Sequence, residues 1–586
     1  MRKIWLIFTP AERRKVLGMF VLVVLMAAAE TLGVVSITPF LSVLGRPEII
    51  QENLALLTIY DYFGFHHVRD FTIALGLASI ALVVGSSIFK IVTQHLLNRF
   101  VNLQRHSLSS RLLSRYLHQP YEFFLDRNPA ILSKNVLSEV DQLMFDVVKP
   151  LSQLVAQGAV VLAMALLVLT YDPLMAVFLV ATLALLYGTI YGLVRIRLGH
   201  IGRERRQANG QRFQACNEVL GGIKDVKVTH SAAAYMQKFN YASRLYSRHS
   251  ATNETLNQSP LYLVESIGYS GLIIIALVLL MGSNDIAHVL PALGLYGFAA
   301  YRMLPAAQVM YRGFARLKFA SAALDAIYRD LALPEQVASE SADVLPLTRE
   351  IRLHGIRYAY PSTPEKPVFD NYDLVIPANT SVGIVGKSGA GKSTLMDILL
   401  GLLTPQAGTL SVDGVSVEAN NVAAWQRSIG YVPQHIYLAD SSVKENIAFG
   451  ISLGQIDMKA VERAARAAQI HDFVITELPQ GYETPVGDRG VRLSGGQRQR
   501  VGIARALYSD PSVLLLDEAT SSLDSETEEG FNEAVKELSG SKTIVVISHK
   551  ETSLESCHET VFVHAQNDKP RIKPESSADT NFGLLT

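Results

Sequence analysis

Residues 381–394 read SVGIVGKSGAGKST, in which an apolar run is followed by a glycine-rich loop and a Lys-Ser-Thr triplet. The apolar run Ser381–Val385 predicts a short buried strand, and a helix is expected from Thr394 onward. A loop of this kind between a strand and a helix turns backbone N–H groups toward a phosphate, and the helix dipole favours the same negative charge. The predicted phosphate-binding residues are Gly386, Ser388, Gly389, Ala390, Gly391, Lys392, Ser393 and Thr394.

A second motif lies downstream, where the apolar strand Val513–Leu516 is followed by two adjacent acids, Asp517 and Glu518. Asp517 is expected to hold Mg²⁺, usually through water, together with the hydroxyl of Ser393. Glu518 is expected to polarise the attacking water as a general base, and Lys392 to contact the β- and γ-phosphates. The two motifs together predict a site that hydrolyses ATP with Mg²⁺.

The sequence LSGGQ at Leu493–Gln497 indicates which nucleotide-binding family the chain resembles. It matches the signature motif of the ATP-binding cassette (ABC) family at every position; the alternative is a Gly-Gly turn that only caps a helix. The resemblance covers about residues 350–563. It implies that two nucleotide domains face each other, so that one chain caps the γ-phosphate bound by the other with Ser494, Gly495, Gly496 and Gln497. A homodimer is therefore expected, because no motif of the site is degenerate.

Other positions match the same family residue by residue. The resemblance implies that Tyr360 stacks on adenine, Gln434 links Mg²⁺ to the membrane half, Asp524 belongs to a loop that couples the two sites, and His549 contacts the γ-phosphate. The segment Thr484–Gly490 resembles the part of exporters that touches helical bends of the membrane half. Pro485 and Asp488 stand where the family usually has Glu, so the family's detailed contacts are not carried over.

The first 312 residues are much more apolar than the nucleotide half. Over the whole chain 49% of residues are hydrophobic and 18% are charged, whereas soluble domains carry about 25% charge. A hydrocarbon core of about 30 Å needs roughly 20 apolar residues as helix, and six stretches approach or reach that length. They are Val16–Leu44, Phe71–Phe89, Leu151–Tyr171, Pro173–Val194, Ser266–Asn284 and Ile286–Tyr311. Six such runs exceed what the core of a soluble protein needs, so membrane spans are predicted rather than buried helices.

The predicted fold is therefore an α-helical six-span membrane domain fused to an α/β nucleotide-binding domain of ABC type. From about Arg349 short apolar strands alternate with helices, a pattern typical of a mainly parallel sheet. The expected divisions are a membrane domain at 1–330, a polar linker at 331–348, the nucleotide-binding domain at 349–566 and a disordered tail at 567–586.

Basic residues indicate how the chain is oriented in the membrane. Lys and Arg are concentrated before the first span and in the two long connections, which begin after Phe89 and Val194, whereas the other loops are short or acidic. The N-terminus, both connections and the nucleotide-binding domain are therefore expected in the cytoplasm, with the spans in the inner (cytoplasmic) membrane. Each connection is predicted to be helical with a short helix at its bend, near Tyr121–Asn128 and Gly221–Thr229.

Four ionisable residues interrupt or border the apolar stretches: Glu30, Lys90, Glu265 and Arg302. A charge in hydrocarbon costs about 2.5–3.5 kcal/mol, so it normally meets a partner or a water-filled cavity. Lys90 and Glu265 are interpreted first as side chains that reach the membrane interface. Glu30 and Arg302 lie deeper and are expected to face a cavity, where Arg302 either holds a phosphate bidentately or pairs with Glu30.

Three features resemble the lipid-linked oligosaccharide flippases among ABC exporters, namely Asn53–Phe65, Ala300–Ala307 and Gly401–Leu403. That group implies a polyprenyl-diphosphate-linked glycan as substrate. Its diphosphate would meet the basic members of a cavity formed by Glu30, Lys90, Arg99 and Arg302. The alternatives are a lipid or multidrug exporter and a peptide exporter. The apolar stretch Asn53–Phe65 predicts either a helix on the outer leaflet or an ordinary loop packed on the bundle.

Composition argues against several other classes. The formal net charge is zero, which gives no electrostatic reason to expect a nucleic-acid partner. The two cysteines, Cys216 and Cys557, match no metal-binding spacing and are expected to be reduced thiols. The first apolar run continues far past the length of a signal peptide, so cleavage there is not expected.

Overall fold

The structure is a computed structural model that describes residues 2–45, 47–171, 173–282, 286–334, 344–518, 536, 538–548, 557–563 and 571–574. The chain divides into two compact units. The helical unit comprises Met1–Leu117 and Arg127–Glu335, and the nucleotide unit comprises His118–Asp126 and Gln336–Thr586. The predicted membrane domain at 1–330 is continuous, whereas the helical unit is not, because His118–Asp126 packs with the nucleotide unit.

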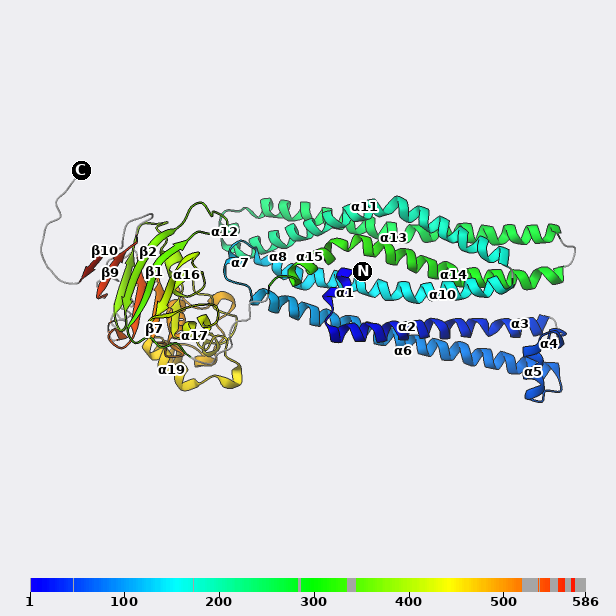
Figure 1. Ribbon diagram of the computed structural model, residues 1–586, viewed down its shortest axis with the longest axis horizontal. Coiled ribbons are helices and arrows are strands. Elements are labelled where there is room, and N and C mark those ends of the chain that lie inside the picture. Colours follow the sequence, from blue (N-terminus) through cyan, green and yellow to red (C-terminus); the bar gives the residue numbers. More distant parts are fainter. Residues whose placement is uncertain are drawn as a thin grey trace. The chain divides into compact units, whose positions relative to one another are not determined.

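Every element of the helical unit within the described residues is a helix (Figure 1). In chain order these are α1 (Arg2–Ile7), α2 (Pro10–Val35), α3 (Ile37–Gly45), α4 (Ile49–Glu52), α5 (Leu54–Tyr62), α6 (Val68–Leu117), α8 (Pro129–Lys134), α9 (Val140–Leu143), α10 (Lys149–Tyr171), α11 (Pro173–Gly221), α12 (Ile223–Val228), α13 (Ala232–Gly282), α14 (Ile286–Phe319) and α15 (Ser321–Leu331). Two π-helical turns, Asn135–Glu139 and Met144–Val148, join α8, α9 and α10 into one continuous rod.

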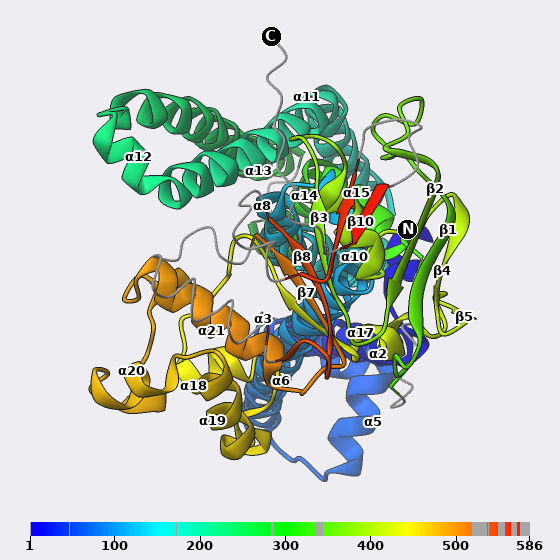
Figure 2. The same ribbon diagram turned by 90° about the vertical axis from the view of Figure 1, so that its left-hand side faces the viewer.

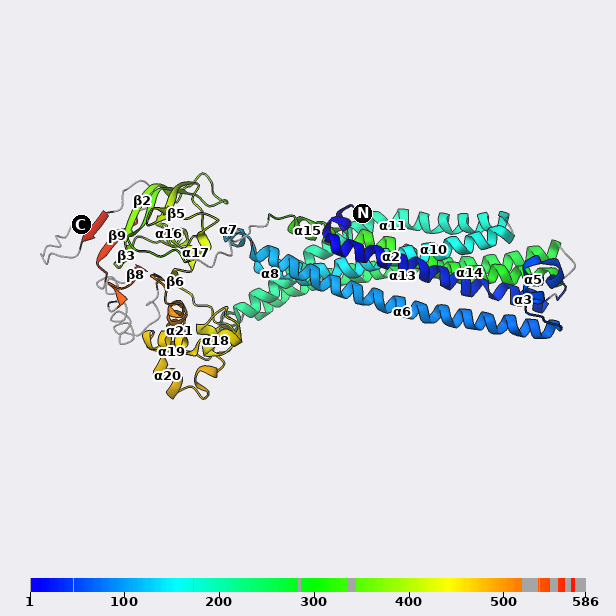
Figure 3. The ribbon, with the colours of Figure 1, turned by 60° about the horizontal axis from the view of Figure 1, so that its bottom comes forward.

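The long helices extend well beyond the thickness of a membrane. α6 has 50 residues, α11 has 49 and α13 has 51. At 1.5 Å per residue each is about 75 Å long, against about 30 Å of hydrocarbon. α2 packs on α6, α10 on α14 and α11 on α13, and these helices run side by side in both views (Figures 1 and 3). The two long connections are thus helical, as predicted.

Four helical stretches of the described residues are long and apolar enough to cross a membrane. They are Pro10–Gly33, Val68–Leu117, Pro129–Leu166 and Val180–Gly221. They contain the whole of the second predicted span and most of the first, third and fourth. The fifth and sixth predicted spans fall within α13 and α14 and the intervening residues 283–285, which lie partly outside what the structure describes.

Short helices occupy both predicted bends. α7 (Glu122–Leu125) lies within Tyr121–Asn128, and α12 lies within Gly221–Thr229, so these two predictions are confirmed. The outer stretch also forms a helix, α5, which begins at a cap where Asn53 Oδ1 accepts hydrogen bonds from the N–H groups of Ala55 and Leu56. Its Tyr60 packs edge-on against Phe71 of α6 at 5.2 Å, whereas Leu54 and Tyr62 are exposed. The helix therefore packs one side on its neighbours and leaves the other side free.

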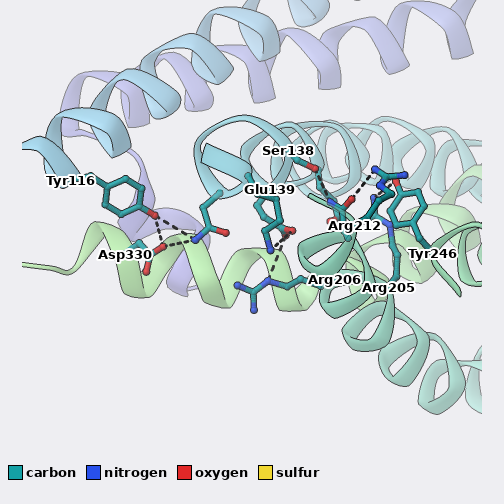
Figure 4. A network of polar contacts seen from close by, with 12 residues as sticks. Tyr116, Ser138, Glu139, Arg205, Arg206, Arg212, Tyr246 and Asp330 are labelled. Atoms are coloured by element: carbon teal, nitrogen blue, oxygen red, sulfur yellow. Dashed lines mark hydrogen bonds and ion pairs between the residues drawn. The ribbon is translucent and has the colours of Figure 1, made fainter. Parts of the chain in front are cut away.

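A buried polar network ties α6, α11 and α15 to the π-helical part of the rod (Figure 4). Tyr116 donates to Asp330 at 2.5 Å, and Asn135 Nδ2 donates to the same carboxylate at 2.9 Å. Glu139 is fully buried between two cations, with Lys134 Nζ at 3.4 Å and Arg206 Nε at 3.7 Å. These contacts fix the π-helical part of the rod to three neighbouring helices.

Within the described residues, the nucleotide unit contains two sheets and the helices that cover them (Figures 1 and 2). Its strands are β1 (Glu350–Tyr358), β2 (Phe369–Pro377), β3 (Ser381–Val385), β4 (Ala407–Val412), β5 (Val415–Ser416), β6 (Ile429–Val432), β7 (Val513–Asp517), β8 (Thr543–Ile547), β9 (Glu559–Phe562) and β10 (Arg571–Pro574). Besides α7, its helices are α16 (Lys392–Leu399), α17 (Val422–Gln426), α18 (Val443–Ile447), α19 (Met458–Ala467), α20 (His471–Thr476) and α21 (Gly495–Leu507).

The larger sheet positions the site. Its strand order is β10-β9-β3-β8-β7-β6, and all of its pairs are parallel except β10 with β9. β3, β7 and β8 are almost wholly buried, as expected for parallel strands covered on both faces. The smaller antiparallel sheet, β2-β1-β4-β5, lies on one side of them, and α18–α21 gather on the other (Figure 2). Because parallel strands end at one edge, the residues that follow β3, β6 and β7 come together there.

Two findings concern the ends of the nucleotide domain. Within the predicted linker 331–348, Leu345 N donates to Ala424 O at 3.1 Å and Leu347 is buried in the core. The predicted disorder of 567–586 is wrong for Arg571–Pro574, which form β10 antiparallel to β9. Backbone pairing with β9 supplies order that the polar composition of the tail does not indicate.

Candidate functional site

The glycine-rich loop after β3 has the geometry of a phosphate cradle. Gly389 and Gly391 have φ values of 80° and 97°, a left-handed conformation that glycine adopts without strain. A Cβ atom on Gly386 would lie 2.6 Å from Val563 O, so no side chain fits there. Lys392 begins α16, and its Nζ donates to the carbonyl oxygens of Gly386 at 2.8 Å and of Lys387 at 3.3 Å. The ammonium thus lies over the loop, at a helix N-terminus that favours anions.

The two predicted acids stand at the end of β7, the second strand from the loop in the same sheet. Burial raises the pKa of Asp517, the adjacent Glu518 raises it further, and Lys392 lowers it. The effect of Lys392 on this pKa indicates that the Asp517 carboxylate lies within electrostatic range of the loop lysine. A cation near Asp517 would relieve the penalty that burial imposes on its charged form.

Glu518 is held in a strained conformation. Its φ is 48°, which is uncommon for a residue with a side chain and costs of order 1 kcal/mol or more. Its N–H donates to Ile547 O of β8 at 2.9 Å, and its carboxylate accepts a hydrogen bond from Gln434 Nε2 at 2.7 Å. Strain of this kind concentrates at functional positions, so the backbone supports the role expected for Glu518.

Ser494 and Gln497 of the LSGGQ motif cap α21, and Ser494 is also accessible. Ser494 Oγ accepts from Gln497 N at 3.2 Å, and Gln497 Oε1 accepts from Ser494 N at 2.8 Å, which completes a capping box. Ser494 is nevertheless exposed. No hydrogen bond between described residues joins Ser494 or Gly496 to the phosphate loop. The helical cap and the family role are therefore compatible in one chain.

The predicted adenine-stacking residue, Tyr360, lies against the loop helix. Its hydroxyl is 2.9 Å from Thr394 Oγ1, in the first turn of α16. Ser393, next to Thr394, is exposed. The structure thus brings Tyr360, Lys392, Ser393, Gln434, Asp517 and Glu518 around one edge of the sheet. Two predicted residues, Asp524 and His549, lie outside the described residues.

In the helical unit, three of the four ionisable residues in or beside the apolar stretches form a cluster. Glu30 Oε1 accepts a hydrogen bond from Lys90 Nζ at 2.7 Å and is also paired with Arg302. The three residues come from α2, α6 and α14. Lys90 is therefore paired with a carboxylate, a contact that its interpretation as an interface residue did not include. Arg99, nine residues along α6 from Lys90, is exposed and stands apart from the cluster.

Sequence patterns missed three residues of the nucleotide unit. Tyr358 lies beside Tyr360 with ring centroids 5.3 Å apart, and its hydroxyl donates to Glu122 of α7 at 2.9 Å. Burial and then Asp517 raise the pKa of Asp397 to about 6. A phenol two residues before Tyr360 was a usable signal for Tyr358, whereas its partner Glu122 lies 236 positions away and left none.

Comparison with known proteins agrees with this geometry. The family described as ABC transporter matches residues 369–521, and the ABC transporter transmembrane region matches residues 16–286. The ATP-dependent lipid A-core flippase of Cupriavidus metallidurans is 29% identical over 568 residues, 96% of this chain and 91% of that protein. The mitochondrial ATP-binding cassette sub-family B member 10 of Mus musculus is 40% identical over 233 residues, 38% of this chain and 32% of that protein.

A solved structure has the same fold. It is the structure of a bacterial Atm1-family ABC exporter with ATP bound, with a TM-score of 0.77, 21% identity and coverage of 95% of both chains. The predicted combination of a helical membrane region and an ABC-type nucleotide domain is confirmed. The chain belongs to the ABC transporter family, as an ATP-hydrolysing half-transporter of the exporter fold that carries one transmembrane region and one nucleotide-binding domain.

Proposed function

We propose that this transporter is a flippase that moves a polyprenyl-diphosphate-linked oligosaccharide across the inner (cytoplasmic) membrane as a homodimer. The observation that carries the proposal is the cluster of Glu30, Lys90 and Arg302. Two cations share one carboxylate, so the cluster keeps one net positive charge among apolar helices. A guanidinium and an ammonium suit the oxygens of a diphosphate, whereas a neutral drug gains nothing from them.

The relatives support a lipid-type substrate. Several are named ATP-dependent lipid A-core flippases, at 28–29% identity to this chain. The assignment of a glycan and a polyprenyl chain to the substrate rests on sequence resemblance. The outer stretch around α5 and residues 300–307 resemble those of the lipid-linked oligosaccharide flippases. Exposed apolar side chains on α5, Leu54 and Tyr62 among them, suit a helix that meets lipid.

Hydrolysis is assigned to the edge of the larger sheet. Lys392 and the loop N–H groups bind the phosphates, and Glu518 accepts a proton from the attacking water while Gln434 holds its carboxylate. Ser393, Gln434 and Asp517 offer hydroxyl, amide and carboxylate oxygens, which is a donor set that fits Mg²⁺. When bound, Mg²⁺ neutralises charge on the phosphates. His549 is proposed to contact the γ-phosphate.

Dimerisation supplies the second half of each site. Ser494 and Gly496 are at the N-terminus of a 13-residue helix, and Ser494 is accessible for a ligand held by another chain. ATP then binds the two nucleotide units to each other. Its hydrolysis releases them, and the resulting population shift drives the membrane helices between two states. The distribution of Lys and Arg supports a cytoplasmic location for the basic connections and the nucleotide unit.

A lipid or multidrug exporter is the second candidate, favoured by one apolar cavity. The cavity has a volume of about 390 Å³ and lies between α10, α11 and α14. Tyr187, Tyr191 and Phe314 line it together with aliphatic side chains. Such a lining suits an apolar molecule and offers no cation to a phosphate.

The test is stimulation of ATPase activity by defined ligands in liposomes. The panel holds a polyprenyl-diphosphate-linked glycan, a phospholipid and an apolar drug. We expect the diphosphate lipid to stimulate most, and Arg302→Glu to abolish that stimulation. The matched control is Arg69→Glu, the same charge reversal at an exposed arginine. Equal stimulation by the phospholipid or drug, or stimulation by the diphosphate lipid that survives Arg302→Glu, contradicts the proposal.

A further inference from the structure

The helix α7 is attached to two different parts of the molecule. Along the chain it connects α6 with α8, two helices of the helical unit. By packing it belongs to the nucleotide unit, together with the rest of His118–Asp126. A movement of α7 is therefore passed to α6 and α8 through covalent bonds, so its contacts with the nucleotide unit decide what moves it.

Tyr358 provides one of these contacts through a buried hydrogen bond. Its side chain is in the core at the end of β1, with no exposed surface. Its hydroxyl donates to Glu122 Oε1 at 2.9 Å, and Glu122 is its only hydrogen-bond partner among the described residues. Burial and this bond both raise the pKa of Tyr358, so the phenol stays neutral and remains a donor. A buried hydroxyl without a partner is costly, which makes Glu122 the residue that satisfies it.

From Tyr358 the contacts continue to the nucleotide site. The ring of Tyr358 meets that of Tyr360 edge-on, at 5.3 Å and 84°. The hydroxyl of Tyr360 lies 2.9 Å from Thr394 Oγ1, two residues after the loop lysine Lys392. An unbroken series of contacts, Glu122–Tyr358–Tyr360–Thr394, thus joins α7 to the phosphate-loop helix.

Electrostatic interactions also connect the start of α7 with the phosphate-loop helix. Burial, followed by the negative charge of Asp397 and the proximity of Tyr360, raises the pKa of Tyr121, the residue before Glu122. Asp397 itself is on α16, the helix that begins with Lys392. The N-terminal end of α7 therefore lies within electrostatic range of Tyr360 and of Asp397 on the phosphate-loop helix.

We propose that Tyr358 is a positioning residue that couples occupancy of the nucleotide site to α7 through its hydrogen bond with Glu122. The inference rests on the proposed stacking of adenine on Tyr360. A base stacked on Tyr360 fixes the plane of that ring, which fixes its edge contact with Tyr358 and so the hydroxyl that holds Glu122. The coupling is reciprocal, so α7 in turn alters nucleotide affinity.

Hydrogen exchange of the full chain in nanodiscs tests this coupling without any transport substrate. Amide exchange of residues 118–126 is measured with and without the β,γ-imido analogue of ATP. In the wild type the analogue slows this exchange. In Tyr358→Phe, which keeps the ring and deletes one hydroxyl, the protection falls by about five-fold, the effect of one ordinary hydrogen bond on an equilibrium. Glu122→Ala loses the protection too, whereas Glu122→Gln retains an acceptor oxygen and restores most of it.

Tyr372→Phe is the matched control, because it deletes one hydroxyl from the same core. The Tyr372 hydroxyl is buried and has no hydrogen-bond partner within the described part of the chain. We expect wild-type protection of residues 118–126 in this variant. Exchange of β7 and β8 reports in every variant whether the nucleotide unit has folded.

Two results would overturn the inference, and they are distinguishable. If Tyr358→Phe keeps the wild-type protection while Tyr360→Ala raises the KM for ATP, adenine binds as proposed but Tyr358 does not couple it to α7. If Tyr360→Ala leaves the KM for ATP unchanged, the proposed adenine contact itself is wrong. The series of contacts then has no link to the bound nucleotide.

Discussion

Replacing Glu30 by Gln removes the only negative charge from the cluster of Glu30, Lys90 and Arg302. In the wild type both cations contact one carboxylate oxygen. The change keeps the size of the side chain and its ability to accept a hydrogen bond. It therefore isolates the charge, and it leaves two cations close together among apolar helices.

The magnitude follows from the geometry. Two cations that contact one oxygen lie within about 5 Å of each other, and Coulomb's law at an effective dielectric constant of about 20 gives a repulsion of about 3 kcal/mol. Without bound lipid, Glu30→Gln is thus expected to be less stable than the wild type. A diphosphate that binds both cations relieves the repulsion, so its affinity should rise by up to about 100-fold.

The assay is the concentration of diphosphate lipid that gives half-maximal ATPase stimulation in nanodiscs, together with the Tm without lipid. Glu30→Gln should lower both values. Glu265→Gln is the matched control, because no ion pair of Glu265 is found among the described residues, and it should change neither. A half-maximal concentration that stays the same or rises in Glu30→Gln refutes the assignment of this cluster to an anionic headgroup.

Three other variants test separate parts of the structure. Glu518→Gln should reduce phosphate release by about 100-fold or more while ATP still binds, because it removes the general base; wild-type turnover rules out that role. Glu139→Gln leaves Lys134 buried without a carboxylate, so unfolding should need about 3 kcal/mol less, as seen by a lower Tm than that of Asp141→Asn. Asp397→Asn should raise stability at pH 7.5 in scanning calorimetry. The pKa of Asp397 is about 6 in the folded chain and near 3.8 in the unfolded chain, so the unfolded chain loses this proton first as the pH rises. The stability of the wild type therefore falls as the pH rises from about 4 to 6. An equal fall in Asp397→Asn excludes this explanation.

Local patterns were sufficient for the elements that form the nucleotide site. The apolar run Ser381–Val385 forms β3 with the predicted bounds, and the run Val513–Leu516 forms β7 together with Asp517, because a fully buried parallel strand is apolar along its whole length. The loop needs glycines at fixed positions, and the left-handed Gly389 and Gly391 supply them. The bends were predictable for a similar reason, since polar connections of helical character must turn somewhere.

Contacts between distant residues were not predictable from these patterns. The position of Lys90 at the end of an apolar run favoured the membrane interface, and only the packing of α2 on α6 brings it to Glu30. The hydrogen bond between Glu122 and Tyr358 forms because α7 packs with the nucleotide unit instead of the helical unit, and no sequence periodicity indicates that packing. The strand β10 also escaped notice, because its order comes from pairing with β9 rather than from its own composition.

The most direct test of the account is a comparison of two mixed dimers that carry the same two substitutions, Lys392→Ala and Ser494→Ala. If each site combines Lys392 of one chain with Ser494 of its partner, a dimer with both changes in one chain has no intact site. A dimer with one change in each chain then keeps one intact site. We predict that ATPase activity survives, at up to about half of the wild-type rate, only when the changes are on different chains. Survival only when both changes share one chain would mean that each chain hydrolyses ATP alone, which contradicts the account.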